Sequence, residues 1–483
     1  MDLLSSFLLL LSLLSLSVGE MQPRVGICYG ELGNNLPKPS ESIKLIQNQL
    51  KAKRIKIYGT NPDIIKSITN TDIQISIMLP NELIPSISAN QTLADEWVRN
   101  NVLPFYPKSK IRYLLIGNEI LSNQPNTTWF QLVPAMRKIR VSVKKLGLNK
   151  VKIGTPLAMD CLESSFPPSN GTFRSSVRGE VIEPLLQFLN RTKSFFFVDV
   201  YTYFAWASQP KQINLNYALL QPTNRTFTDP VTGLKYTNLL DQMLDALYFA
   251  MNRTGYPNVR LFIAETGWPN GGDLDQIGAN IYNAATYNRN AVAKFTKKST
   301  AGTPFRPKQV IPAMIFALYN ENNKTGPGTE RHFGQLYPNG SFVYPIDFSG
   351  KTNNYPPLKP EPNSYVGELW CVVKNGANMT AVAGARSWAC SNGNSSHTCD
   401  AIQPKMPCYN SSSSLITQAS YAFSSYWAEM RAVGGSCFFN GLAESTKTDP
   451  ISELANFQVS MLKGSRVRSL IGPRYCSRSL IGY

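Results

Sequence analysis

Short runs of β-branched and aromatic residues recur along the first two thirds of the chain, and stretches of helical periodicity separate them. This alternation is typical of successive β and α units around a parallel sheet. The predicted strands span residues 25–30, 55–59, 73–79, 111–117, 151–155, 195–203, 259–264 and 310–318. The predicted helices include residues 42–51, 127–146, 239–251 and 280–296. Eight strands in about 300 residues predict a (β/α)8 TIM barrel, although the count alone also fits a doubly wound sheet.

Polar residues stand where several of these strands end. Glu119 follows the fourth run, Tyr201 lies in the sixth, Glu265 ends the seventh and Glu321 follows the eighth. Barrel enzymes carry their chemistry at the C-terminal ends of the strands. The four side chains are therefore predicted to converge on one barrel mouth.

Two of these residues suit the hydrolysis of a glycosidic bond. That reaction needs one carboxyl group that stays protonated and a second that stays ionised, on either side of the glycosidic oxygen. Glu119, in Gly117-Asn118-Glu119, and Glu265, in Glu265-Thr266-Gly267-Trp268-Pro269, end strands on opposite sides of the predicted mouth. They are the candidate catalytic pair.

The remaining third of the chain has a different composition. Six of the eight cysteines are Cys371, Cys390, Cys399, Cys408, Cys437 and Cys476, which predicts a small domain held by disulfide bonds, with a connectivity that spacing cannot give. Cys28 and Cys161 are expected to be buried thiols. The predicted divisions are an export signal at 1–19, a catalytic domain at 20–345, a Pro-rich linker at 346–368, the disulfide-rich domain at 369–450 and a basic tail at 451–483.

Charge and targeting signals indicate the partners. An apolar run of signal-peptide length and many Asn-x-Ser/Thr sequons predict a secreted glycoprotein. The formal net charge is +17, but the basic residues are dispersed and form no nucleic-acid module, so acidic wall polysaccharide is the expected counter-ion. His332 and His397 are the only histidines and lie in different domains, so neither a metal site nor a cofactor is expected. We expect a monomer without stable membrane insertion.

At the level of whole motifs the chain resembles a known family. The motifs are Val25-Gly26-Ile27-Cys28-Tyr29-Gly30, Ile116-Gly117-Asn118-Glu119, Ser165-Phe166-Pro167-Pro168-Ser169, Ala264-Glu265-Thr266-Gly267-Trp268-Pro269 and the segment 320–334. They resemble the plant 1,3-β-glucanases of glycoside hydrolase family 17. The cysteine-rich part resembles the X8 domain, also called carbohydrate-binding module 43, through Leu369-Trp370-Cys371-Val372-Val373-Lys374.

The resemblance implies a role for each matching residue. Glu119 would be the acid/base and Glu265 the nucleophile of a retaining endo-hydrolase of 1,3-β-glucan, such as callose or fungal wall glucan, with a covalent glycosyl-enzyme intermediate. The X8 domain would bind the same polymer, with Trp370, Tyr421 and Trp427 as candidate stacking rings. The expected substrate-binding residues are Asn118, Tyr58, Tyr201, Phe204, Trp268, Glu321, Lys324 and Glu330.

Two departures from the family pattern stand out. Asp199 occupies a position where the family usually has Asn, and it could perturb a nearby pKa if its side chain faces inward. Cys476 lies far beyond Asp449-Pro450, so it either closes the X8 framework over a longer loop or stays unpaired.

Two other functions remain open on the sequence. The same carboxyl groups would serve a mixed-linkage glucanase or a transglucosylase. A non-catalytic glucan-binding wall protein is the alternative outside enzymes. In each case the expected location is the cell wall and apoplast, with plant defence among the roles that the residues do not separate.

Overall fold

The computed structural model describes residues 25–297, 301–352, 354–363, 368–393, 398–406, 413–431 and 435–448. The predicted export signal, the basic tail, Cys408 and Cys476 lie outside these residues.

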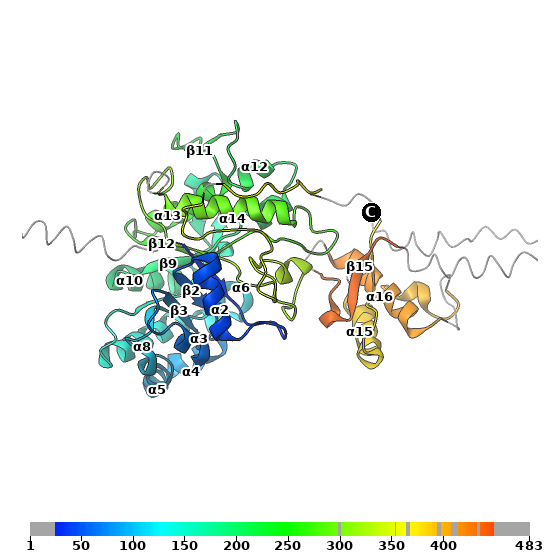
Figure 1. Ribbon diagram of the computed structural model, residues 1–483, viewed down its shortest axis with the longest axis horizontal. Helices are drawn as coiled ribbons and strands as arrows, with labels where there is room; N and C mark the ends of the chain where they lie inside the picture. The colour runs from blue at the N-terminus through cyan, green and yellow to red at the C-terminus, as the bar shows by residue number, and fades with distance from the viewer. Residues whose placement is uncertain are drawn as a thin grey trace, which may run out of the picture.

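A closed parallel sheet forms the first part of the chain (Figure 1). Its order is β5-β4-β3-β2-β1-β13-β12-β9-β6. The strands are β1 (Val25–Tyr29), β2 (Arg54–Ile57), β3 (Gln74–Leu79), β4 (Lys110–Ile116), β5 (Lys152–Gly154), β6 (Pro156–Ala158), β9 (Phe195–Asp199), β12 (Arg260–Thr266) and β13 (Ala313–Ile315). Only Thr155 separates β5, which pairs with β4, from β6, which pairs with β9. One interrupted strand thus closes the barrel, and the (β/α)8 prediction is confirmed.

The strands are buried on both faces, as expected for a parallel sheet covered by helices. On β2, Ile55 and Ile57 pack outward against the helices, so the alternation of strand side chains turns Arg54 and Lys56 into the barrel. Residues that fill the interior include Cys28, Met78, Tyr113, Leu115, Phe195, Phe197, Phe262 and Met314. The barrel is therefore a packed core whose upper end alone is free to bind a ligand.

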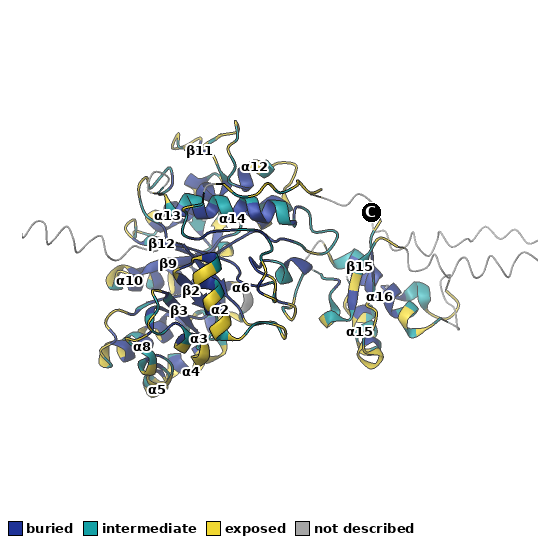
Figure 2. Cartoon of the chain, viewed as in Figure 1, coloured by how far each residue is buried: buried dark blue, intermediate teal, exposed yellow. Residues whose placement is uncertain are grey.

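Helices surround the sheet, and Figure 2 shows their buried faces turned toward it. The larger ones are α2 (Pro39–Leu45), α3 (Pro62–Ser67), α4 (Ile84–Ala89), α5 (Gln91–Asn101), α8 (Leu132–Lys145), α10 (Glu183–Thr192), α13 (Leu239–Arg253) and α14 (Ile281–Thr296). Asn238 and Asn280 cap α13 and α14 by accepting a hydrogen bond from a backbone N–H in the first turn. The helices predicted at 239–251 and 280–296 are thus present, within two residues of their predicted ends.

Shorter elements border the barrel mouth. They are α6 (Ile120–Asn123), α7 (Asn126–Trp129), α9 (Ser175–Val177), α11 (Thr202–Ser208), α12 (Leu215–Ala218), the hairpin of β7 (Leu162–Ser164) and β8 (Thr172–Phe173), and the hairpin of β10 (Phe227–Thr228) and β11 (Lys235–Tyr236). A 3-10 helix, η8 (Gly328–Arg331), follows the last barrel strand.

The catalytic domain extends slightly beyond its predicted end at residue 345. Ile346 and Phe348 are buried in the outer core, the apolar layer between the sheet and the surrounding helices. The Phe348 N–H donates to Leu50 O. Asn363 lies further along the predicted linker, and its side-chain oxygen accepts a hydrogen bond from Asn283. Much of this segment therefore runs along the barrel surface.

The C-terminal module is a small α+β unit, coloured yellow to orange in Figure 1. Strands β14 (Trp370–Val373) and β15 (Ala443–Thr446) pair antiparallel and pack with α15 (Met379–Asn392) and α16 (Leu415–Met430). Disulfides join Cys371 to Cys437 and Cys390 to Cys399. Cys28 and Cys161 of the barrel are buried free thiols, as predicted.

The module contacts the barrel through the loop that carries η8. The Arg331 guanidinium lies 3.8 Å from the centre of the Phe438 ring. The same side chain donates to the carbonyl oxygens of Lys324 and Gly326. Ser436 of the module also donates to Gly326 O, at 3.3 Å. One arginine thus holds a loop of the barrel and a ring of the module at once.

Within the described part of the chain, none of the helices combines the length and the apolar character that a bilayer span requires.

Candidate active site

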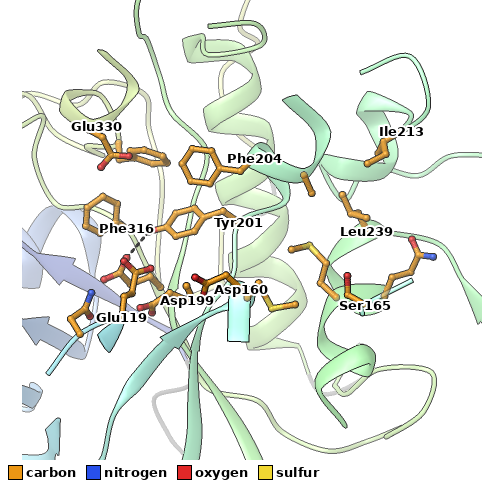
Figure 3. A pocket seen from close by; sticks show the side chains of 18 of the residues that line it. Glu119, Asp160, Ser165, Asp199, Tyr201, Phe204, Ile213, Leu239, Phe316 and Glu330 are labelled. Atoms are coloured by element: carbon orange, nitrogen blue, oxygen red, sulfur yellow. Dashed lines mark hydrogen bonds between the residues drawn. The ribbon is translucent and has the colours of Figure 1, made fainter. Parts of the chain in front are cut away.

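A cavity of about 1480 Å³ opens at the C-terminal ends of the barrel strands. Figure 3 shows the side chains of Glu119, Asp199, Tyr201 and Phe316 gathered at one end of it. Nine of the ten residues predicted to act on substrate line this cavity: Tyr58, Asn118, Glu119, Tyr201, Phe204, Glu265, Glu321, Lys324 and Glu330. Residues from five barrel strands or the loops that follow them therefore meet in one place.

Glu265 is held from three sides at the end of β12. Lys56 Nζ lies 2.7 Å from its Oε1 atom, and the Tyr58 hydroxyl donates to the same oxygen at 2.5 Å. The Tyr201 hydroxyl donates to Oε2 at 2.7 Å, along the dashed line in Figure 3. All three partners favour the ionised carboxylate.

The charge state of Glu265 follows from competing effects. Burial is the largest, and it opposes ionisation. The Lys56 charge and the three hydrogen bonds outweigh it, so the pKa of Glu265 lies below its usual value. The carboxylate is therefore ionised and orientated at mildly acidic and neutral pH, as a nucleophile requires.

Glu119 sits on a strained turn after β4. Its backbone is left-handed, with φ 47° and ψ 42°, a conformation that non-glycine residues rarely adopt. Asn81 holds the turn by accepting from the Asn118 N–H and donating to the Asn118 carbonyl, and the Glu119 N–H donates to Pro156 O. Such strain persists only where the surrounding structure holds it, and it is frequent at active sites.

The pKa of Glu119 moves in the opposite direction to that of Glu265. Burial and then the negative charge of Glu265 raise it to about 7. One carboxyl group of the pair is thus protonated where the other is ionised. This division suits a general acid beside a nucleophile.

Aromatic rings form part of the cavity wall. Tyr201 packs edge-on against Phe204 and Phe333, with ring centres 5.4 Å and 5.6 Å apart. Phe204 is 46% exposed, so part of its side chain is open to a ligand in the cavity. Apolar ring faces beside a polar carboxyl pair are suited to a sugar ring, which has apolar C–H faces and polar edges.

Glu321, Lys324 and Glu330 occupy the loop after β13. Glu321 is buried and accepts from the Leu32 N–H at 2.7 Å; burial raises its pKa. A Cβ atom at Gly30 would lie 2.5 Å from the Glu321 carboxylate, so a larger residue there would displace this carboxylate. Lys324 and Glu330 form an ion pair at 2.9 Å, and both remain partly open to the cavity.

Trp268 is the one predicted substrate contact that the structure contradicts. Its side chain is fully buried, and its indole N–H donates to Gly278 O. The ring packs against Tyr203, Trp206 and Tyr287. The expectation that Trp268 lines the groove is therefore wrong: the chain turns this ring into the outer core.

Lys56 is the main functional residue that the sequence analysis missed. It is 1% exposed, and besides Glu265 it reaches Asn118 Oδ1 at 3.4 Å. The available signal was a lysine between two isoleucines of a buried strand, at an inward position. A buried lysine requires a charged partner, so this pattern could have indicated the site.

Among the described residues, no group of three or more His, Cys, Asp or Glu side chains is arranged to hold a metal ion.

Comparison with known proteins places these features in a family. The model for glycosyl hydrolases family 17 matches residues 25–348, and that for the X8 domain matches residues 369–444. A probable glucan endo-1,3-beta-glucosidase of Arabidopsis thaliana is 49% identical over 442 residues, which cover 91% of each chain. A glucan endo-1,3-beta-D-glucosidase of Olea europaea is 33% identical, covering 93% of this chain and 96% of that relative.

Solved structures agree with these matches. A β-1,3-glucanase and allergen of Cryptomeria japonica pollen is 37% identical, with a TM-score of 0.63, over 68% of this chain and 99% of its own. A plant β-glucan endohydrolase gives 33% identity and a TM-score of 0.61, over 67% of this chain and 99% of its own.

Proposed function

Because the chain belongs to glycosyl hydrolase family 17, we propose that it cleaves internal 1,3-β-glucosidic bonds of 1,3-β-glucans. The observation that carries this proposal is the division of charge between two glutamates in one cavity. Glu265 is kept ionised by Lys56 and two tyrosine hydroxyls, while burial keeps Glu119 protonated to about pH 7.

The reaction proceeds in two displacements. Glu265 attacks the anomeric carbon while Glu119 gives its proton to the departing glycosidic oxygen, which leaves a glycosyl ester on Glu265. The Glu119 carboxylate then takes a proton from water, and that water breaks the ester. Two inversions restore the original β configuration.

The neighbouring residues bind and orientate the sugar in this proposal. Asn118, beside Glu119, bonds the hydroxyl next to the reacting carbon. Tyr201 and Phe204 support a ring face, while Glu321, Lys324 and Glu330 bind hydroxyl groups from the loop opposite. The size of the cavity supports cleavage within a chain, because a volume of about 1480 Å³ is far larger than one sugar.

The C-terminal module is proposed to hold the same polymer. Trp370, Tyr421 and Trp427, the rings first considered for stacking, are almost fully buried and belong to the module's core. Trp388 is 49% exposed and rests on Tyr426, with ring centres 5.1 Å apart. We assign Trp388 as the ring on which a sugar stacks.

Export to the cell wall accompanies this function. Two disulfides in the described part of the module indicate an oxidising compartment. The surplus of basic residues would retain the protein on acidic wall polysaccharide.

The test is the release of reducing sugar from linear 1,3-β-glucan by the wild type and by Glu265→Ala. We expect short oligosaccharides of β configuration from the wild type, and a loss of turnover by several orders of magnitude in the folded variant. Mixed-linkage glucan and a sugar acceptor, supplied in parallel, detect the alternative specificities. A folded wild type that is inert on all of these polymers but binds them would replace the hydrolase with a glucan-binding protein.

A further inference from the structure

A third carboxyl group lies beneath the catalytic pair. Asp199 is the last residue of β9, and it pairs in register with Glu265 on the neighbouring strand. Its side chain is fully buried, and neither of its oxygens has a hydrogen-bond partner within the described residues. Among the described residues its one salt-bridge partner is Lys56, whose Nζ lies 3.9 Å from Asp199 Oδ1 but 2.7 Å from Glu265 Oε1.

Lys56 therefore interacts with Glu265 and Asp199 to different extents. Lys56 makes its close, hydrogen-bonded contact with Glu265 and only a distant one with Asp199. A carboxylate that is buried without hydrogen bonds loses its hydration with little compensation, whereas the neutral acid loses much less. Protonation is therefore favoured at Asp199, whereas ionisation is favoured at Glu265.

The other groups around Asp199 act in the same direction. Its charged and titratable neighbours are Lys56 of β2, Glu265 of β12, Glu119 after β4, the Cys28 thiol of β1 and the Tyr201 hydroxyl. Only Lys56 carries positive charge. Burial and then the charge of Glu265 hold the pKa of Asp199 well above its usual value.

We propose that Asp199 is a third carboxyl group of the active centre, one that keeps its proton while Glu265 is ionised and so leaves Lys56 to pair with the nucleophile alone. This inference rests on the function proposed above. Asp199 is a positioning residue, since it acts through Lys56 and Glu265 and not on the sugar.

The neutral acid has a consequence for both displacements. Before the reaction, the charges of the centre are those of Lys56 and Glu265. In the glycosyl ester, Glu265 is uncharged and the negative charge has moved to Glu119. A protonated Asp199 leaves the net charge at zero in both states, whereas an ionised Asp199 would add a negative charge that favours protonation of Glu265 and Glu119.

The first test measures stability against pH, so it does not depend on activity. A group whose folded pKa is raised contributes stability below its unfolded pKa, near 4, and loses it as pH rises. Asp199→Asn does not titrate. Relative to the wild type, its folding equilibrium constant should therefore rise by about tenfold per pH unit above pH 4, for as long as folded Asp199 keeps its proton. Thermal or denaturant unfolding between pH 4 and 7 measures this ratio.

The control is Asp160→Asn, which removes an exposed carboxylate from the same cavity. Its ratio to the wild type should change little over the same range. A ratio for Asp199→Asn that stays flat or falls over this range would overturn the proposal, because an Asp199 that is ionised in the folded protein takes up no proton on folding above its unfolded pKa near 4.

Two further measurements keep the proposal testable if Asp199→Asn does not fold. Burial also raises the pKa of Asp245, in α13, to about 7, so the spectra are recorded on Asp245→Asn. With ¹³C-labelled aspartate, that protein should still contain the infrared band of a protonated carboxylic acid at pH 6, and the absence of the band would refute the proposal. If Asp199→Asn folds, the acid limb of its pH profile, the fall of kcat/KM toward low pH as Glu265 is protonated, should stay in place. If Asp199 were ionised in the wild type, the substitution would release Lys56 to Glu265 and move this limb to lower pH by a unit or more. Failure of the proposed function would instead appear as a wild type inert on glucan, with the spectrum unaffected.

Discussion

Removal of the Lys56 charge should displace the whole pH profile of the enzyme. In Lys56→Met the side chain keeps its length and apolar stem but loses the ammonium group beside Glu265. The nucleophile then retains only the hydroxyl groups of Tyr58 and Tyr201, so its pKa rises. Glu119 loses the same favourable charge, and its pKa also rises, by less.

The size of the effect follows from one distance. At 2.7 Å between Lys56 Nζ and Glu265 Oε1, and an effective dielectric constant of about 20, Coulomb's law gives an attraction of about 6 kcal/mol. One pKa unit corresponds to about 1.4 kcal/mol, so the upper bound is about 4 units. The two retained hydrogen bonds, and water entering the vacated space, reduce this shift. We expect the acid limb of kcat/KM to rise by at least about 2 units.

The assay is the release of reducing sugar from 1,3-β-glucan across pH 3 to 9, with circular dichroism at each pH. Lys324→Met is the matched control, because Lys324 pairs with Glu330 at 2.9 Å in the same cavity but is partly exposed. Exposed pairs contribute only about 0–1 kcal/mol, so its acid limb should stay within about half a unit of the wild type. A folded Lys56→Met whose acid limb coincides with that of the wild type would refute the role given to this lysine.

Three other outcomes are expected. Glu119 must be protonated to act as an acid and its pKa is raised to about 7, so wild-type kcat/KM should fall as pH rises through about 7, and Glu119→Gln should lose that limb along with most activity on unactivated glucan. Trp268→Ala should lower the free energy of unfolding in urea by about 3–5 kcal/mol and leave KM of the folded protein unchanged, since the ring fills the outer core. A raised KM at unchanged stability would instead show that Trp268 contacts the substrate. Replacing Cys371 and Cys437 by Ser should lower the free energy of unfolding of the module by about 2–5 kcal/mol. In calorimetry the unfolding transition of the module should move to a lower temperature, while that of the barrel stays unchanged.

The sequence predicted the barrel well because its strands are short, apolar and separated by turn residues and helices. Each of the eight predicted runs overlaps a strand of the sheet, and Glu119 and Glu265 could be placed at strand ends from that pattern alone. The splitting of the fifth strand at Thr155 was not predictable, because it depends on which neighbours the two halves pair with.

The side chains around the glutamates were harder to place. When a strand is buried on both faces, apolar residues surround the inward positions, and Lys56 then resembles a surface residue at a strand end. Trp268 was misplaced for a related reason: the pairing of β12 is irregular around Ala264, so alternation no longer gives the direction of the residues that follow. The positions of Lys324 and Glu330 depend on how a loop closes, and local sequence does not determine that.

Arg331 contacts both the barrel loop and Phe438 of the module, and this double contact affects how domains of such chains can be exchanged. The module could be exchanged for an unrelated one at a junction in the Pro-rich segment, which is the domain boundary predicted from the sequence. The exchange would still remove the Phe438 contact that helps to hold the loop with Lys324 and Glu330. A chimera would therefore inherit a looser rim around its cleft, although every barrel residue is unchanged. The unit to transplant is the barrel together with the face of the module on which its loop rests.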